Sequence, residues 1–143
     1  MSKVSATLNQ EVKKEQPKMS LKSLKDLIFI GKTERKVELG GFEFVLSSVT
    51  AEDQRTMISR LLRMPEDSRA FYAKIISLAF SIKTVNLTPL EMIEVDGNFE
   101  DVIEKKMHII QSLQVSLVNK LYMTYEQLMS ESNAEVDIEE VKK

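Results

Sequence analysis

Hydrophobic residues recur every three or four positions along much of this chain, which is the spacing of one face of an α-helix. The longest such pattern runs from Phe99 to Ser130. As a single helix this span would extend about 48 Å at 1.5 Å per residue, longer than a domain of this size is wide. We therefore predict a break near Gln111–Ser116 and two helices in place of one.

Two shorter helices are predicted before this pattern. Thr50 can accept hydrogen bonds from the free N–H groups of a helix start, and the acids that follow it suit the positive end of the helix dipole. Pro65 interrupts the pattern and opens a further helix with a broad apolar stripe. That helix is expected to end near Lys83, before a loop over 84–88 and one short helical turn after Pro89.

One segment instead alternates between apolar and polar residues, which is the period of a half-buried β-strand. The alternation lies on both sides of Gly40-Gly41, and glycine adopts the positive φ angles of a tight turn at no steric cost. A β-hairpin is therefore predicted at about 36–47. An isolated hairpin is marginally stable in water, so it must pack on helices or pair with another chain. The expected fold class is mainly α with one β-hairpin, a compact helical bundle.

Charge changes this picture at the two ends of the chain. Residues 1–36 contain nine Lys or Arg and four acids, so this segment carries +5 and the remainder of the 143 residues carries −7. Polar, charged ends of this kind are usually solvated. The predicted organisation is a flexible basic arm over 1–20, a helical domain over 21–130 and a flexible acidic tail over 131–143.

The residue types that catalysis needs are scarce or isolated. The chain has no Cys and one His, His108, and no Gly-X-Ser-X-Gly motif accompanies it. Glu104 precedes His108 by four residues, but two ligands on one helix are weak evidence for a metal site. Asp96-Gly97-Asn98 lacks the spaced acids of a calcium loop. We predict no catalytic residues, no metal ligands and no cofactor, and therefore a protein that is not an enzyme.

Other proteins are the partners that these observations favour. No segment reaches the roughly 18 consecutive apolar residues of a membrane span, so no membrane is expected and the predicted location is the cytosol. Nucleic acid is disfavoured because the basic residues of 3–36 include a single Arg and are partly offset by acids. The candidate partner-binding residues are apolar positions that an isolated domain would leave uncovered: Leu21, Leu24, Leu27, Ile28, Phe42 and Phe44. The alternative is that 21–28 folds back and fills the domain's own core.

The order of three stretches resembles a known family. A strand leads through Val49-Thr50-Ala51-Glu52 into a helix, the stretch Leu78 to Asn86 follows, and the helix that contains Leu121-Tyr122 and Tyr125 closes the pattern. This order is similar to that of the small helical tail-assembly and baseplate-hub proteins of tailed bacteriophages. The likeness covers roughly Val37 to Leu128. It departs from the family at Asn86-Leu87, where glycine is commoner.

The resemblance implies a role in binding other phage tail or baseplate proteins of the tape-measure or hub type. The chain would act either as an assembly chaperone, which shields an apolar helix of its client, or as a small structural subunit of the virion. Its location would be the host cytoplasm during assembly, or the virion tail. A homo-oligomer is compatible with both roles. The alternatives are a cytosolic helical adaptor or regulator, and a nucleic-acid-binding factor that uses residues 3–36.

Overall fold

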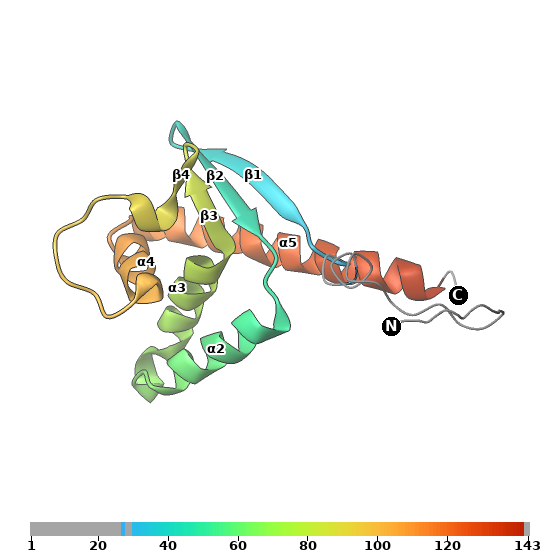
Figure 1. The fold of residues 1–143 in the computed structure, drawn as a ribbon, viewed down its shortest axis with the longest axis horizontal. Helices are drawn as coiled ribbons and strands as arrows, with labels where there is room; N and C mark the ends of the chain where they lie inside the picture. Colours follow the sequence, from blue (N-terminus) through green and yellow to red (C-terminus); the bar gives the residue numbers. More distant parts are fainter. Residues whose placement is uncertain (1–26, 28–29, 142–143) are drawn as a thin grey trace, which may run out of the picture. The chain divides into compact units, whose positions relative to one another are not determined.

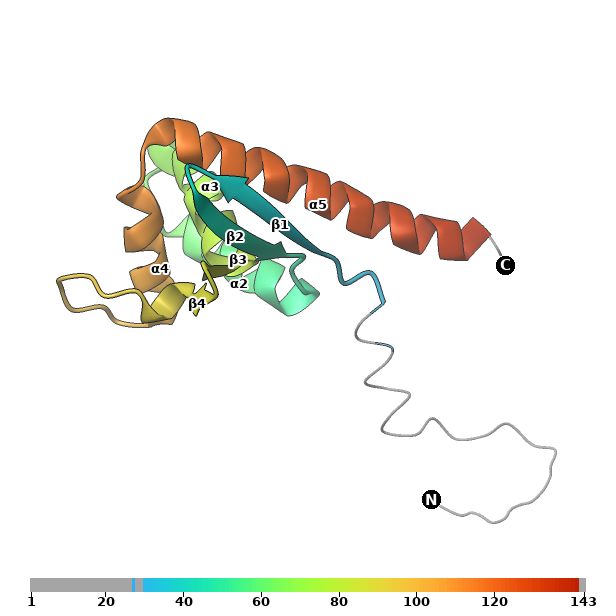
Figure 2. The same cartoon turned by 90° about the horizontal axis from the view of Figure 1, so that it is seen from above.

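A computed structural model describes Leu27 and residues 30–141. The chain divides into two units, Met1–Ile30 and Gly31–Lys143, and the elements of the second are shown in Figures 1 and 2. Their bounds, in chain order, are β1 Glu34–Leu39, β2 Phe42–Ser47, α2 Ala51–Leu62, the 3-10 turn η1 Glu66–Ser68, α3 Arg69–Ser81, β3 Ile82–Val85, β4 Thr88–Pro89, the 3-10 turn η2 Leu90–Met92, α4 Val102–Gln111 and α5 Val115–Val141. The predicted fold class, mainly helical with a β-hairpin, is confirmed.

The hairpin forms where the alternation predicts it. Strands β1 and β2 pair antiparallel, with Leu39 opposite Phe42 at the turn. The two turn residues, Gly40 and Gly41, have φ angles of 60° and 84°, which side chains with a Cβ rarely adopt. Glycine at both positions therefore allows the two-residue connection.

The sheet is larger than the predicted hairpin, and the expectation of a loop over 84–88 is wrong. Strand β3 continues directly from α3 and pairs with β2, and β4 pairs with β3, so the strand order is β1-β2-β3-β4. Asn86 secures the pairing through two hydrogen bonds to Glu43. Its side-chain oxygen accepts from the Glu43 N–H, and its own N–H donates to the Glu43 carbonyl, each at 2.7 Å. The turn that follows β3 contains no glycine, so the sequence lacked the usual signal for a hairpin.

The predicted helix boundaries follow local chemistry. Thr50 caps α2, since its hydroxyl accepts from the Asp53 N–H at 3.0 Å and the Asp53 carboxylate accepts from the Thr50 N–H at 3.2 Å. The expected break in the long pattern is confirmed, because α4 ends at Gln111 and α5 begins at Val115. Each boundary was predicted from a cap or from the limit on helix length.

Helix α5 continues to Val141, through most of the segment that the composition assigned to a flexible tail. Two of its residues beyond Ser130, Glu131 and Ser132, contact the segment that leads into the sheet and its first strand. The Arg35 guanidinium forms an ion pair with Glu131, and the Ser132 hydroxyl donates to the Gly31 carbonyl. Acidic composition alone predicted a solvated tail, whereas Glu131, the first residue of that segment, pairs with Arg35 of the sheet.

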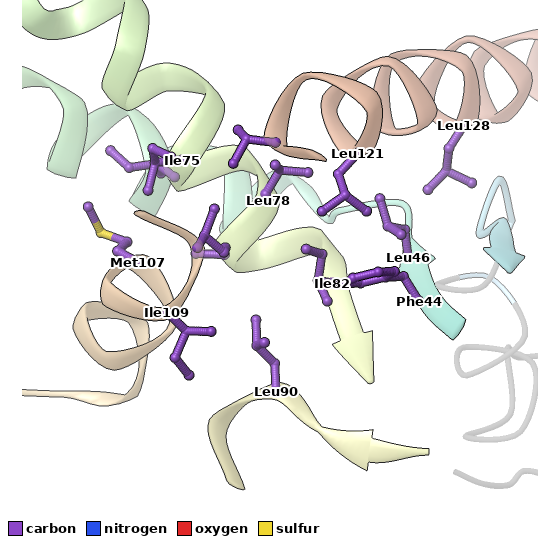
Figure 3. Packing of buried hydrophobic residues seen from close by; sticks show 14 residues of the cluster. Phe44, Leu46, Ile75, Leu78, Ile82, Leu90, Met107, Ile109, Leu121 and Leu128 are labelled. Carbon is purple, nitrogen blue, oxygen red and sulfur yellow. The ribbon is translucent and has the colours of Figure 1, made fainter. Parts of the chain in front are cut away.

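The core lies between one face of the sheet and helices α3, α4 and α5 (Figure 3). Leu46 from β2, Leu78 from α3 and Leu121 from α5 are fully buried in it. Helix α5 covers the face of β1, where Arg35 also donates to the Gln127 side chain at 3.2 Å. None of the helices in the described ranges is both long and apolar enough to cross a bilayer.

Candidate functional site: an apolar seam along helices α3 and α5

The first component of the site is an apolar groove where the end of α4 and the start of α5 meet α3. It has a volume of about 380 Å³. Its apolar lining comes from the three helices and from the short connection between α4 and α5: Phe71, Ile75, Ile110, Leu113, Val115 and Val118. A groove of this composition removes apolar surface from water when a complementary side chain enters it.

The second component is a smaller groove, of about 200 Å³, between α2, α3 and α5. Met57, Ile58 and Leu61 of α2 form one wall, and Tyr122 and Tyr125 of α5 form the opposite wall. The two tyrosine rings stack with their centroids 5.7 Å apart. The groove is therefore apolar along its sides, with phenol groups on one wall.

The two grooves follow one another along the packing line of α3 and α5, which we call the α3–α5 seam. On α3, Phe71 and Ile75 line the first groove and Ile76 lines the second; on α5, Val118 lines the first and Tyr122 the second. On each helix the residues that line the two grooves lie within two helical turns of one another, so the grooves are adjacent. The seam therefore offers a long apolar strip.

Lys74 lies where the two grooves meet and is the single charged residue among those that line them. Its ammonium group is 3.1 Å from the Asn119 side-chain oxygen and 5.9 Å from the centre of the Tyr122 ring. Burial raises the pKa of both Tyr122 and Tyr125, with the charge of Glu126 a second cause at Tyr122. Both phenols are therefore neutral near pH 7, and the seam carries one positive charge.

Helix α2 leaves part of its apolar face open to solvent. It is amphipathic, yet none of its residues is fully buried, and the side chains of Ile58 and Leu62 are exposed. At the other end of the seam Phe71 is exposed and Val115 keeps 69% of its surface accessible. A soluble domain rarely presents several large apolar side chains around a groove unless that surface binds something.

A third, more polar hollow of about 390 Å³ lies beside α4 and is lined in part by Arg60, Glu104 and His108. Each of these groups has a structural partner. Arg60 pairs with Asp101, Glu104 accepts from the Glu100 N–H at 2.6 Å, and the His108 ring packs on Phe99 at 5.2 Å. The described residues include no cluster of three or more His, Cys, Asp or Glu arranged to hold a metal ion.

The candidate partner-binding residues have different outcomes. Leu21, Leu24 and Ile28 lie outside the described residues, while Leu27 is described and exposed. Phe42 keeps 52% of its surface accessible beside the turn.

Phe44 requires a correction, because it is only 5% exposed and belongs to the core. It shares a face of β2 with Phe42, but it lies farther from the turn, where the helices cover that face. The seam residues Ile58, Phe71 and Val115 were missed, since an apolar helical stripe in a sequence indicates burial without showing which part stays open.

Comparisons with protein-family models, with curated proteins and with solved structures gave no match.

Proposed function

We propose that this chain is a protein-binding subunit that acts in bacteriophage tail or baseplate assembly and holds an apolar helical segment of a tape-measure or hub protein. The observation that supports the proposal is the α3–α5 seam, a strip of two apolar grooves beside a helix with no buried residue. The phage context rests on the resemblance of the stretches between Val37 and Leu128.

A helix is the partner that suits the shape and chemistry of the seam. Aliphatic side chains spaced three, four and seven residues apart on such a helix would enter successive grooves. An acidic side chain near the middle of the same face would meet Lys74, which is half-buried and lies 5.9 Å from the centre of the Tyr122 ring. The expected client segment is therefore amphipathic, with aliphatic anchors and a central Asp or Glu.

The two roles implied by the resemblance differ in the lifetime of the complex. A chaperone would shield the client helix and leave before the tail is complete, whereas a virion subunit would stay bound. Both roles use the same surface. Purified particles would contain the chain in the second case and lack it in the first.

Co-expression with the tape-measure and hub proteins of the same phage tests the proposal. Val115→Asp places a charge in the first groove at an exposed position, so the domain should still fold. The matched control is Met92→Asp, because Met92 is 66% exposed on η2 and lines neither groove. We expect the wild type and Met92→Asp to co-purify with one tail protein and Val115→Asp to lose it.

Equal retention of the client by both variants would remove the seam from the proposal. If neither protein co-purifies with the wild type, the phage role itself is refuted. Circular dichroism of each variant would show that the loss of binding does not reflect unfolding.

A further inference from the structure

The two edges of the sheet are built differently. One edge is β4, which has two residues, and one of these is Pro89, which has no N–H to donate. The other edge is β1, a regular strand of six residues without proline. In the described part of the chain β1 pairs on one side only, with β2. A long, regular edge of this kind can accept a further strand.

Alternate residues of β1 direct their backbone groups toward this outer edge. Leu39 and Phe42 flank a two-residue turn and so form a hydrogen-bonded pair. The alternation continues to Thr33, whose carbonyl accepts from the Ser48 N–H at 2.8 Å. Because bonding alternates along an antiparallel strand, the N–H and C=O groups of Glu34, Lys36 and Glu38 face outward.

The charges on the open face of β1 lack complements within the sheet. Glu38 lies opposite Glu43 of β2, and like charges in that arrangement repel each other. Lys36 lies opposite Val45, which provides no countercharge. Neither Lys36 nor Glu38 forms an ion pair with a residue in the described ranges. A strand with the reverse order of charges would complement both.

We infer that β1 pairs antiparallel with β1 of a second copy of this chain, with Val37 opposite the partner's Val37. In this register Lys36 lies opposite the partner's Glu38 and Glu38 lies opposite the partner's Lys36. These are also the residues whose backbone groups face outward, so charge pairing and hydrogen bonding select the same register. The sheets of the two copies then become continuous.

The neighbouring registers are less favourable. Moving one strand by two residues in one direction sets Lys36 against the partner's Lys36 and Glu34 against the partner's Glu38. Moving it two residues further restores opposite charges, but Arg35 then lies opposite the partner's Arg35. It also sets Glu38 against the partner's Lys32, which precedes the first residue of β1. The register centred on Val37 uses strand residues for each charge pair.

The other face of β1 provides apolar surface at the same edge. Leu39, Met123 and Gln127 line a shallow hollow of about 180 Å³ between β1 and α5, and Met123 is 58% exposed. The register places the partner's Arg35 opposite Leu39, at the margin of this hollow. The aliphatic part of an Arg side chain packs on apolar surface while its charge stays solvated. This inference rests on the sheet edge and is independent of the proposed function.

Charge reversal in the full-length chain tests the pairing by sedimentation velocity over a concentration series. We expect the wild type to dimerise reversibly. Lys36→Glu and Glu38→Lys should each weaken the dimer by about 10- to 100-fold, since each replaces two attractive cross-strand pairs with two repulsive ones. The matched control is Lys83→Glu, the same charge change at an exposed position of the inner strand β3, which should dimerise like the wild type.

Two combinations separate loss of pairing from loss of folding. An equimolar mixture of the Lys36→Glu and Glu38→Lys proteins should form heterodimers, because each charge then meets its opposite. The double variant Lys36→Glu/Glu38→Lys should again form homodimers in this register, whereas the register that opposes Arg35 to the partner's Arg35 would leave it repulsive. A wild type that stays monomeric up to its solubility limit, or a double variant that does not recover dimerisation, would overturn the inference.

Discussion

At the residue scale, Asp101 connects the start of α4 to α2. One carboxylate oxygen accepts from the Glu104 N–H at 2.8 Å, which caps the helix, and the other pairs with Arg60. The Arg60 side chain is mostly covered, and its Nε atom is buried with no hydrogen-bond partner. The Glu104 N–H, together with Arg60, therefore lowers the pKa of Asp101 below its ordinary value of 3.8.

Replacing this carboxylate should destabilise the domain at neutral pH. We expect Asp101→Ala to lower the free energy of unfolding by about 1–2 kcal/mol, because the helix loses its cap and Arg60 loses its partner. Urea denaturation at pH 7 measures the difference, with the exposed Glu94→Ala as a near-neutral control. An equal effect from the control variant would mean that the cap contributes nothing specific.

The same carboxylate gives a pH dependence with a defined sign. Since its folded-state pKa is depressed, its contribution is fully present above pH 3.8 and is lost as the pH falls through the lower, folded-state pKa. The stability difference between the wild type and Asp101→Ala should therefore shrink as acid is added below pH 3.8. A difference that stays constant in acid would show that the charge of Asp101 is not involved.

At the element scale, local signals predicted the boundaries that local chemistry sets. Gly40-Gly41 marked the hairpin, and Thr50 marked the start of α2. Strand β3 was missed because its first residue, Ile82, continues the apolar stripe of α3. Its pairing with β2 is a tertiary interaction, and its turn uses Asn86 and Leu87 at positive φ. Tertiary pairing overrode a helical pattern that the sequence carried without interruption.

The turn after β3 contains backbone strain that glycine would relieve. Leu87 has a φ of 69° and is highly exposed, so its side chain gains little burial in return for a left-handed backbone. We expect Leu87→Gly to raise the free energy of unfolding by about 1 kcal/mol. Chemical denaturation compares it with Leu87→Ala, which keeps the Cβ and should gain less. An equal gain from alanine would assign the effect to the lost apolar side chain rather than to φ.

At the scale of the whole molecule, the position of the α3–α5 seam follows from how the helices pack around the core. The sequence shows apolar stripes on α2, α3 and α5, but it does not show which of them the sheet covers. Leu78 and Leu121 face the sheet and are fully buried, whereas Ile58 and Val115 remain exposed at the margins. Exposure therefore depends on the mutual packing of elements, and that packing could not be predicted from periodicity alone.

The residues of the long helix α5 differ in how much they contribute to the stability of the domain. Leu128 is fully buried, so Leu128→Ala should cost about 2–5 kcal/mol of unfolding free energy through the lost contacts and the cavity left behind.

Beyond Leu128, the ion pair of Arg35 with Glu131 is partly exposed, and such pairs contribute about 0–1 kcal/mol. Removing residues 131–143 should therefore cost no more than about 1 kcal/mol from that pair, with the Ser132 bond adding a similar amount at most. Thermal and urea unfolding of the two variants would rank them, and a truncation as damaging as Leu128→Ala would show that the end of α5 is an integral part of the fold.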